Sequence, residues 1–230
     1  MTLNTSQQAI VLIKFFSEEK HYLAFKGGSS IFRTPHYFRQ SEDSGRGDRA
    51  ESCLGYWNRR LGDNVPHLTL DGRTYNTKDA ESILIYPAYE QQDAWLQSWC
   101  MIGPHNGFEH SLERMLDEFG TYFVVLPATK IGEYARLLAQ ASDLPVRCGL
   151  VRYSDDPLER SLTVKDAKYG YQKEYRFFIG QCDKDEVKEM PLQLQGIDRL
   201  VLSASSLRLT SPSGLKSYCS LGRRKVVKVS

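Results

Sequence analysis

The sequence has no apolar segment long enough to cross a membrane. Its longest apolar run, AIVLIKFF at residues 9–16, is interrupted by Lys14 and is much shorter than the roughly 20 residues that a membrane-spanning helix needs. The first residues, MTLNTSQQ, lack the basic start and the small-residue cleavage site of a secretory signal peptide. These absences predict a cytoplasmic protein with no membrane partner.

Cysteines are few and scattered. There are five, an odd number, and no two of them form a C-x-x-C pair. Neither a disulfide framework nor a zinc site is therefore expected, and the pattern is typical of reduced thiols in a cytosol. The positions are Cys53, Cys100, Cys148, Cys182 and Cys219.

Common catalytic and nucleotide-binding signatures are also missing. The chain has no P-loop, no G-x-G-x-x-G, no H-E-x-x-H and no G-x-S-x-G. The closest histidine pair, His105 and His110, has a spacing that does not place both side chains on one helical face. No metal site is predicted, because two-histidine sites usually need a spacing of about four residues or a third ligand.

The composition and the local sequence patterns predict a single α+β domain over residues 1–230. Hydrophobic residues make up 41% of the chain and charged residues 25%, which suffices for a core. Local patterns favour mixed, mostly antiparallel sheets with a few packed helices, because helices and strands alternate without a regular βαβ order. Helices are expected at residues 4–20, 49–62, 107–120 and 128–142. Strands are expected at residues 21–28, 29–38, 81–89, 94–103, 121–127, 146–154, 173–180, 197–204, 207–212 and 224–229.

The first candidate ligand site is a charged stretch, FRTPHYFRQSEDSGRGDRAES, at residues 32–52. Arg46 can bind phosphate or carboxylate bidentately, and the glycines on either side of it let the backbone bend around a ligand. Asp48 and Glu51 lie three residues apart, as an N-cap residue and its capping-box partner do. Asp48 is therefore expected to cap the following helix, while Arg46 is offered to an anionic ligand.

The second candidate site is KYGYQKEYRFFIG at residues 168–180. In a strand, Gln172, Glu174 and Arg176 share one face, and Tyr171 precedes them as part of a stacking platform. A carboxylate in this place can hold a ribose hydroxyl and stabilise positive charge on a sugar carbon. The alternative is a common Glu–Arg pair on an exposed face, which contributes little energy. The residues alone do not decide between these two interpretations.

Basic residues gather in the last segment, GRRKVVKVS. No acidic residue follows Asp198. Such a segment attracts phosphates through counterion release, so Arg223, Arg224 and Lys225 are candidate contacts for a nucleic-acid substrate. The plainer interpretation, which we favour, is an edge strand whose charges discourage pairing with other sheets.

Several of these stretches together resemble a loosely defined family of uncharacterised bacterial and phage proteins. The matching residues are IFRTPHYFRQSED with RGDRAE, then GLVRYSD, then KDAKYGYQKEYRFF, and they span most of residues 21–180. They correspond to the family's F-x-T-P-x-x-F/Y, RGD-x-x-E, V-x-Y and Y-x-x-E-Y-R patterns. The resemblance implies a phage- or prophage-associated role as a toxin, a defence protein or a counter-defence protein.

The stretch Gln172-Lys173-Glu174 is similar to the Q-x-E motif of mono-ADP-ribosyltransferases, in which the Glu is catalytic. The resemblance implies an ADP-ribosyltransferase-like fold and NAD as the substrate. Glu174 would hold the nicotinamide ribose, and Gln172 would orient the acceptor. The family's Ser-Thr-Ser strand motif is absent, because its nearest echo, VLSASSLRL, follows Glu174 instead of preceding it. This departure argues against the arginine-specific subclass.

The same resemblance suggests which other residues would contact NAD and the acceptor. His21 or Arg33 would grip NAD from an early strand, and Tyr37 would stack on it. Arg46 joins these cofactor-binding candidates through its ability to bind phosphate. The substrate-binding candidates are Tyr171, Arg176, Arg223, Arg224 and Lys225.

The sequence leaves open whether the chain is an enzyme. The leading hypothesis is an ADP-ribosyltransferase-like protein that modifies nucleic acid or protein. The first alternative is a non-enzymatic inhibitor that binds a host or phage protein, or nucleic acid, through the charged stretch. The second alternative is a nuclease in which Asp48, Glu51 and Glu174 hold a divalent cation.

Overall fold

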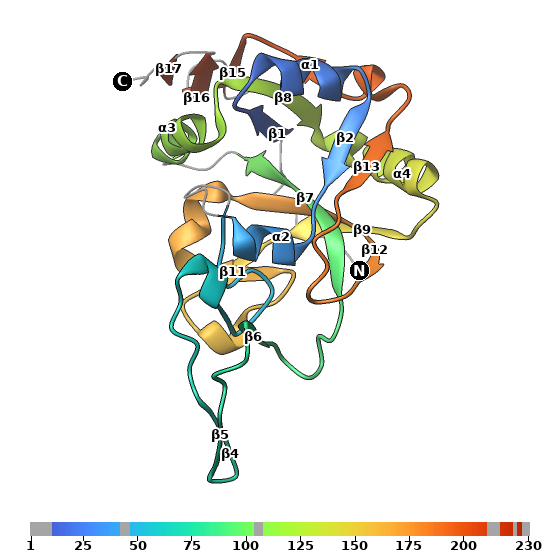
Figure 1. The fold of residues 1–230 in the computed structure, drawn as a ribbon. Coiled ribbons are helices and arrows are strands. Elements are labelled where there is room, and N and C mark those ends of the chain that lie inside the picture. The colour runs from blue at the N-terminus through green and yellow to red at the C-terminus, as the bar shows by residue number, and fades with distance from the viewer. Residues whose placement is uncertain (1–10, 42–46, 104–107, 211–216, 223–224, 227–230) are drawn as a thin grey trace, which may run out of the picture.

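A six-stranded antiparallel sheet forms the centre of the protein, with its strands in the order β14–β8–β1–β7–β12–β9 (Figure 1). The strands are β1 Val11–Phe16, β7 Asp93–Ile102, β8 Tyr122–Pro127, β9 Val146–Leu150, β12 Glu174–Cys182 and β14 Leu202–Ser203. The structure is a computed structural model that describes residues 11–41, 47–103, 108–210, 217–222 and 225–226.

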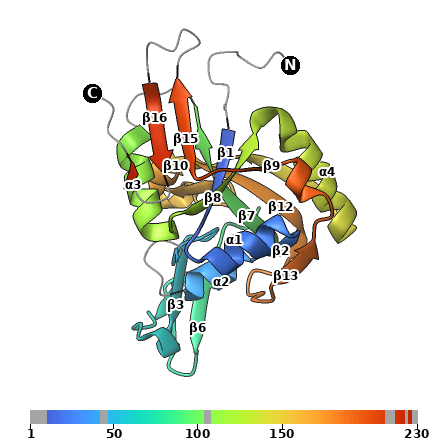
Figure 2. The same ribbon diagram turned by 90° about the horizontal axis from the view of Figure 1, so that it is seen from above.

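Helices cover both faces of this sheet (Figures 1 and 2). On one face, α1 (Glu19–Lys26) and α4 (Ile131–Ser142) pack over a core cluster that includes Trp99 and Phe177. On the other face, α3 (Phe108–Phe119) packs over a second cluster that includes Ile13. Together with the antiparallel ladders, this arrangement confirms the predicted α+β class.

Residues 11–16 form the strand β1 and not part of a helix, so the helix predicted at residues 4–20 is wrong where the structure describes it. Leu12 packs toward α1 and α4, whereas its neighbour Ile13 packs toward α3. A strand buried on both faces lacks polar alternation, and its short apolar run therefore looks the same as that of a buried helix.

The strand predicted at residues 21–28 is instead the helix α1. Tyr22 and Phe25 lie three residues apart and are both buried, while Leu23 is 54% exposed, which is a helical pattern. The strand predicted at residues 29–38 ends early. It divides into β2 (Ser29–Phe32) and α2 (Pro35–Gln40), because Thr34 caps a helix that begins with a proline.

The helix predicted at residues 49–62 is also absent. Turns lead into the short strand β3 (Gly55–Asn58), which pairs with β6 (Ser82–Ile85) and is followed by the 3-10 helix η2 (Arg59–Leu61). Tyr56 and Asn58 are buried at a spacing of two, as strand residues on one face are.

Smaller elements surround the central sheet. The hairpin of β4 and β5 projects away from the rest of the chain (Figure 1). No helix within the described ranges is long and apolar enough to cross a membrane. The remaining elements are β4 Leu68–Leu70, β5 Arg73–Tyr75, β10 Arg152–Ser154, β11 Val164–Asp166, β13 Met190–Gln193, β15 Ser206–Thr210, β16 Ser217–Gly222 and β17 Lys225–Val226, with the 3-10 helices η3 Ala128–Lys130, η4 Pro157–Glu159, η5 Ala167–Gln172 and η6 Ile197–Arg199.

The central sheet opens between β1 and β7. Their ladder ends at the pair Ile13 and Cys100, although β1 stays paired with β8 as far as Phe16. Further along β7, the backbone of Arg33 pairs with that of Leu96 and closes the far end of the opening, with N–O distances of 3.2 and 2.8 Å. The opening positions the site described next.

Candidate functional site

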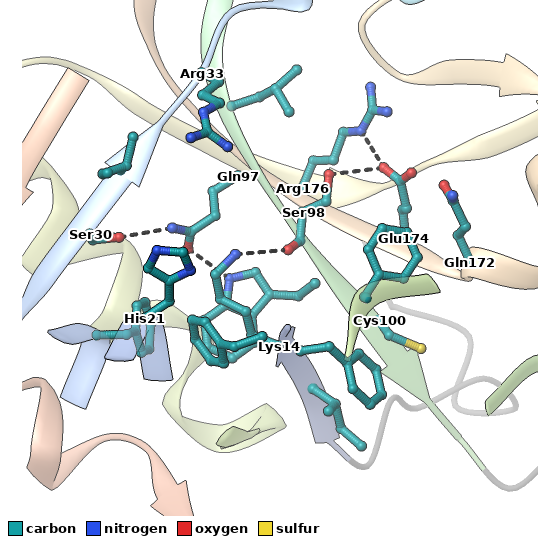
Figure 3. A pocket seen from close by; sticks show the side chains of 18 of the residues that line it. Lys14, His21, Ser30, Arg33, Gln97, Ser98, Cys100, Gln172, Glu174 and Arg176 are labelled. Carbon is teal, nitrogen blue, oxygen red and sulfur yellow. Dashed lines mark hydrogen bonds and ion pairs between the residues drawn. The ribbon is translucent and has the colours of Figure 1, made fainter. Parts of the chain in front are cut away.

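A cavity of about 320 Å³ lies where β1 and β7 part (Figure 3). Residues of β1, β7 and β12 line it, together with residues of α1, β2 and α3. Its volume lies within the range of roughly 300–1,000 Å³ that is usual for small-molecule sites. We call this cavity the pocket.

The pocket brings together several site residues that the sequence predicts. They are distant in the chain: His21 comes from α1, Arg33 follows β2, and Gln172, Glu174 and Arg176 lie at and just before the start of β12. All of them line the pocket, and Figure 3 shows them around it.

The two faces of β12 carry the side chains expected of them. Glu174 and Arg176 both reach the pocket, and the Arg176 Nε donates to the Glu174 carboxylate at 2.6 Å. Tyr175 and Phe177 belong to the core cluster on the opposite face. The Glu–Arg pair is buried, with 7% and 1% of its side chains exposed. It is therefore not the exposed pair that the alternative interpretation describes.

Four charged side chains in the pocket wall form a closed set of ion pairs, which we call the ionic ring: Glu51, Lys165, Glu174 and Arg176. Arg176 holds Glu51 bidentately, with Nη1–Oε1 at 2.7 Å and Nη2–Oε2 at 2.9 Å. The Lys165 Nζ lies 2.8 Å from Glu174 Oε1 and 3.5 Å from Glu51 Oε2. Two cations and two carboxylates therefore balance in charge inside the protein.

Neutral groups fix the orientation of this ring. The Ser98 hydroxyl donates to Glu174 Oε2 at 3.0 Å, and the Glu174 amide donates to the Tyr153 hydroxyl at 2.8 Å. The Lys165 ammonium also donates to Gln172 Oε1 at 3.0 Å. Gln172 and Glu174 are therefore held side by side through one lysine.

Neighbouring charges determine whether the carboxyl groups of the ionic ring are ionised. Burial alone would raise the pKa of Glu174, but the positive charges of Arg176 and Lys165 outweigh it and hold the pKa well below its usual range. The same two cations outweigh burial at Glu51 and lower its pKa. Both carboxylates are therefore ionised near neutral pH. They can accept hydrogen bonds but cannot act as acids there.

Asp48 has a different environment beside the ring. Burial, together with the charge of Glu51, raises its pKa from 3.8 to about 6. Its carboxylate accepts the Ala50 amide at 3.0 Å within a turn. Because no helix follows, the expected N-cap role is wrong for Asp48. Glu51 likewise does not complete a capping box, since it reaches across the pocket wall to Arg176.

The carboxylates of the nuclease hypothesis do come close together. Asp48, Glu51 and Glu174 all act electrostatically on Lys165, which lies among them with Arg176. Two side-chain cations thus already neutralise Glu51 and Glu174. Within the described part of the chain, no group of three His, Cys, Asp or Glu side chains is arranged to hold a metal ion.

Two predicted aromatic contacts lie outside the pocket lining. The Tyr37 ring lies under the Arg33 guanidinium, 4.4 Å from ring centroid to Cζ, and so contacts a pocket residue. The Tyr171 hydroxyl donates to Glu118, and the Arg114 guanidinium covers its ring at 3.6 Å. Tyr171 therefore joins η5 to α3 and is not an exposed stacking platform.

Other predicted residues cannot be placed. Arg46, Arg223 and Arg224 lie outside the described residues, as does His105. Lys225 begins β17, which pairs with β16 in the sheet β15–β16–β17, and its side chain is not described. The candidate phosphate contact of the charged stretch and the basic last segment thus stay predictions.

The sequence interpretation missed two lysines of the pocket. Lys165 begins the stretch KDAKYGYQKEYRFF, but nothing in its local pattern marks it as a buried partner of Glu174. Lys14 did carry a signal, because it is the single charge inside the apolar run AIVLIKFF. A charge at the centre of a buried strand needs a partner or a cavity.

Comparisons with known proteins give no relative for this chain. No protein-family model, no curated protein and no solved structure matches it.

Proposed function

We propose that the protein binds NAD in the pocket and transfers ADP-ribose to a nucleic-acid or protein acceptor. The observation that carries the proposal is the position of Glu174. Its ionised carboxylate lines a cavity of small-molecule size, beside Gln172 and across from His21 and Arg33. The Q-x-E resemblance gives these residues their roles.

The proposed reaction needs an anion that stays ionised. The bond between the ribose C1′ and the nicotinamide nitrogen breaks, and nicotinamide leaves neutral with the bonding electron pair. Glu174 accepts a hydrogen bond from a ribose hydroxyl and stabilises the positive charge that develops on the sugar. An acceptor oxygen or nitrogen then bonds to C1′ and releases its proton to solvent.

The ionic ring suits this role in one respect. Because its pKa is lowered, the Glu174 carboxylate keeps its charge although it is buried, since the positive charges of Arg176 and Lys165 compensate for the loss of water. The Ser98 hydroxyl and Lys165 also keep the carboxylate in one orientation. Such preorganisation favours stabilisation of a transition state.

The same ring favours a second candidate function. Both oxygens of Glu174 already have partners inside the protein, as the carboxylate of a purely structural network does. A non-enzymatic protein that binds a host or phage partner would need the ring only for stability. In that case a Glu174→Gln variant that folds keeps the function of the protein.

An incubation with labelled NAD tests the proposal. Purified protein is mixed with cell lysate and, separately, with nucleic acid, and transferred label and released nicotinamide are both measured. We expect Glu174→Gln to abolish transfer and Glu159→Gln to preserve it, because Glu159 pairs with Arg152 on the exposed surface. Circular dichroism of each variant shows that it is folded.

The result that contradicts the proposal is equally definite. Wild-type protein that neither transfers label, nor releases nicotinamide, nor changes its melting temperature with NAD is not an ADP-ribosyltransferase. Transfer that persists in folded Glu174→Gln would remove Glu174 from the mechanism.

A further inference from the structure

The strand β9 lies at one end of the central sheet. Among the described strands, β12 is the only one paired with it, so the other side of β9 has no strand beside it. Two hydrogen bonds at the ends of this ladder show the direction of the backbone groups. The Gly180 amide donates to the Pro145 carbonyl at 2.9 Å, and the Val151 amide donates to the Glu174 carbonyl at 3.0 Å.

Three residues of β9 turn their backbone N–H and C=O groups away from β12. Backbone groups alternate in direction along an antiparallel strand, so every second position between Pro145 and Val151 faces outward. The free stretch ends at Arg152, whose amide donates to the Thr163 carbonyl at 2.9 Å. The outward residues are Val146, Cys148 and Leu150.

This edge has little of the protection that edge strands usually carry. Charges, prolines and bulges are the common devices against pairing with another strand. β9 contains one charge, Arg147, and no proline, and its ladder with β12 runs without a register shift. Cys148 is exposed, and Leu150 is 50% exposed. The edge is therefore open to a further strand.

β9 is complementary to a second copy of itself. In an antiparallel pair centred on Cys148, each outward residue exchanges two hydrogen bonds with the residue opposite, and Leu150 lies opposite Val146 of the second copy. Arg147 then lies opposite Gly149 of the second copy and does not meet its own charge. A Cβ added at Gly149 would meet no atom within 4 Å, which leaves room for the arginine side chain.

From this self-complementarity we infer that β9 is the interface of a homodimer. Two copies join edge to edge about a two-fold axis, and the central sheet continues from one copy into the other. The occupant of the edge is thus a second copy of this chain. One pair of short strands buries little surface, so we expect the fraction of dimer to rise with protein concentration.

Analytical ultracentrifugation of the whole chain over a range of concentrations tests the inference. Cys148→Pro removes an outward N–H that β12 does not use, and proline is tolerated at such edge positions. Cys148→Ser is the matched control, because it loses the same thiol and keeps the N–H. We expect wild type and Cys148→Ser to dimerise alike and Cys148→Pro to dimerise at least tenfold more weakly. Circular dichroism shows whether each variant is folded.

A charge placed on each edge of the sheet gives a second comparison, which does not depend on proline. Leu202 is 58% exposed on β14, the strand at the other end of the central sheet. Leu150→Lys should weaken the dimer at least tenfold, and Leu202→Lys should leave it unchanged. Wild-type protein that stays monomeric at every concentration overturns the inference, whatever other partner binds β9. A dimer that Leu150→Lys leaves unchanged overturns it as well.

A cross-link tests the register of the pair. Opposite residues that exchange hydrogen bonds have Cα atoms about 5.5 Å apart, which a disulfide can span. With diamide as the oxidant and Cys219→Ser as the background, Cys148 should link two copies. Cys148→Ser combined with Leu150→Cys should link poorly, because the two introduced thiols lie roughly 13 Å apart along the strands. Equal linkage at both positions would contradict the antiparallel pair centred on Cys148.

Discussion

Arg176 has protein partners at all three of its guanidinium nitrogens. Its Nε donates to Glu174, its Nη2 to Glu51, and its Nη1 to both Glu51 and the Leu162 carbonyl. Only 1% of the side chain is exposed. A buried charge of this kind is tolerable because each of its three nitrogens has a hydrogen-bond partner and its charge is matched. Loss of either carboxylate partner leaves an unbalanced charge in the core.

Glu51→Gln tests how strongly the stability of the fold depends on this charge balance. The substitution leaves the guanidinium of Arg176 and the ammonium of Lys165 with one carboxylate between them. We expect the free energy of unfolding to fall by about 3–5 kcal/mol, the usual cost of breaking a buried pair. Urea denaturation measures it.

The control for Glu51→Gln is a pair on the surface. Glu159→Gln disrupts the exposed pair with Arg152, 2.8 Å apart, and should change the urea midpoint little. If both variants lose the same stability, the ionic ring does not carry the energy assigned to it.

At the scale of helices and strands, the sequence predicts elements that have a clear local pattern. It does not predict contacts between residues that are distant in the chain. The helices α3 and α4 were predicted from their helical periodicity, and the strands β7, β8 and β12 from their β-branched and aromatic residues. β1 was not predicted, since its short apolar run is equally typical of a buried helix. The same limit applies to the site.

The β12 part of the site could be predicted and its partners could not. Glu174 and Arg176 lie on one face of β12, so their common position follows from strand geometry. Gln172 instead ends η5, and Lys165 bonds both Gln172 and Glu174. The pairing of Arg176 with Glu51 joins residues 125 positions apart, and no local pattern specifies it. Glu51 was predicted as a capping-box residue or, in the nuclease alternative, as a metal ligand, and not as a partner of Arg176. Lys165 was given no role.

The turn between α3 and β8 gives a test at this scale. Gly120 has φ +102°, and a Cβ at this position would lie 2.3 Å from the Phe16 carbonyl oxygen. Gly120→Ala should therefore lower stability by more than about 1 kcal/mol, because both the backbone conformation and the space exclude a side chain. Thermal unfolding measures the effect.

A second glycine serves as the control for Gly120. Gly132 lies in α4, and a Cβ added there would meet no atom within 4 Å. Gly132→Ala should leave stability unchanged or raise it by up to about 1 kcal/mol, because alanine favours a helix. Equal stability of Gly120→Ala and wild type would contradict the predicted strain.

For the molecule as a whole, buried carboxyl groups make opposite contributions to stability as the pH changes. Glu51 and Glu174 have lowered pKa values in the folded state, so the stability that they add is present above their ordinary pKa and is lost as the pH falls. Asp48 has a raised pKa of about 6, so its proton stabilises the fold at low pH. That contribution is lost as the pH rises from 3.8 to about 6.

Asp48→Asn should remove the second contribution. The change in the pKa of Asp48 from 3.8 to about 6 corresponds to on the order of 3 kcal/mol. We therefore expect the variant to gain stability relative to wild type between about pH 4 and pH 7. Urea denaturation at both ends of this range measures the difference, and parallel curves for the two proteins would exclude a raised pKa at Asp48.

The contact between Glu51 and Arg176 also bears on how the chain is made. It closes a loop of 125 residues, and the ionic ring cannot balance before Arg176 itself has been synthesised. During synthesis, a ribosome-bound chain that ends before β12 holds Glu51 and Lys165 without their arginine partner. The pocket is thus complete only after β12 has been synthesised, and a product truncated before β12 lacks the ionic ring.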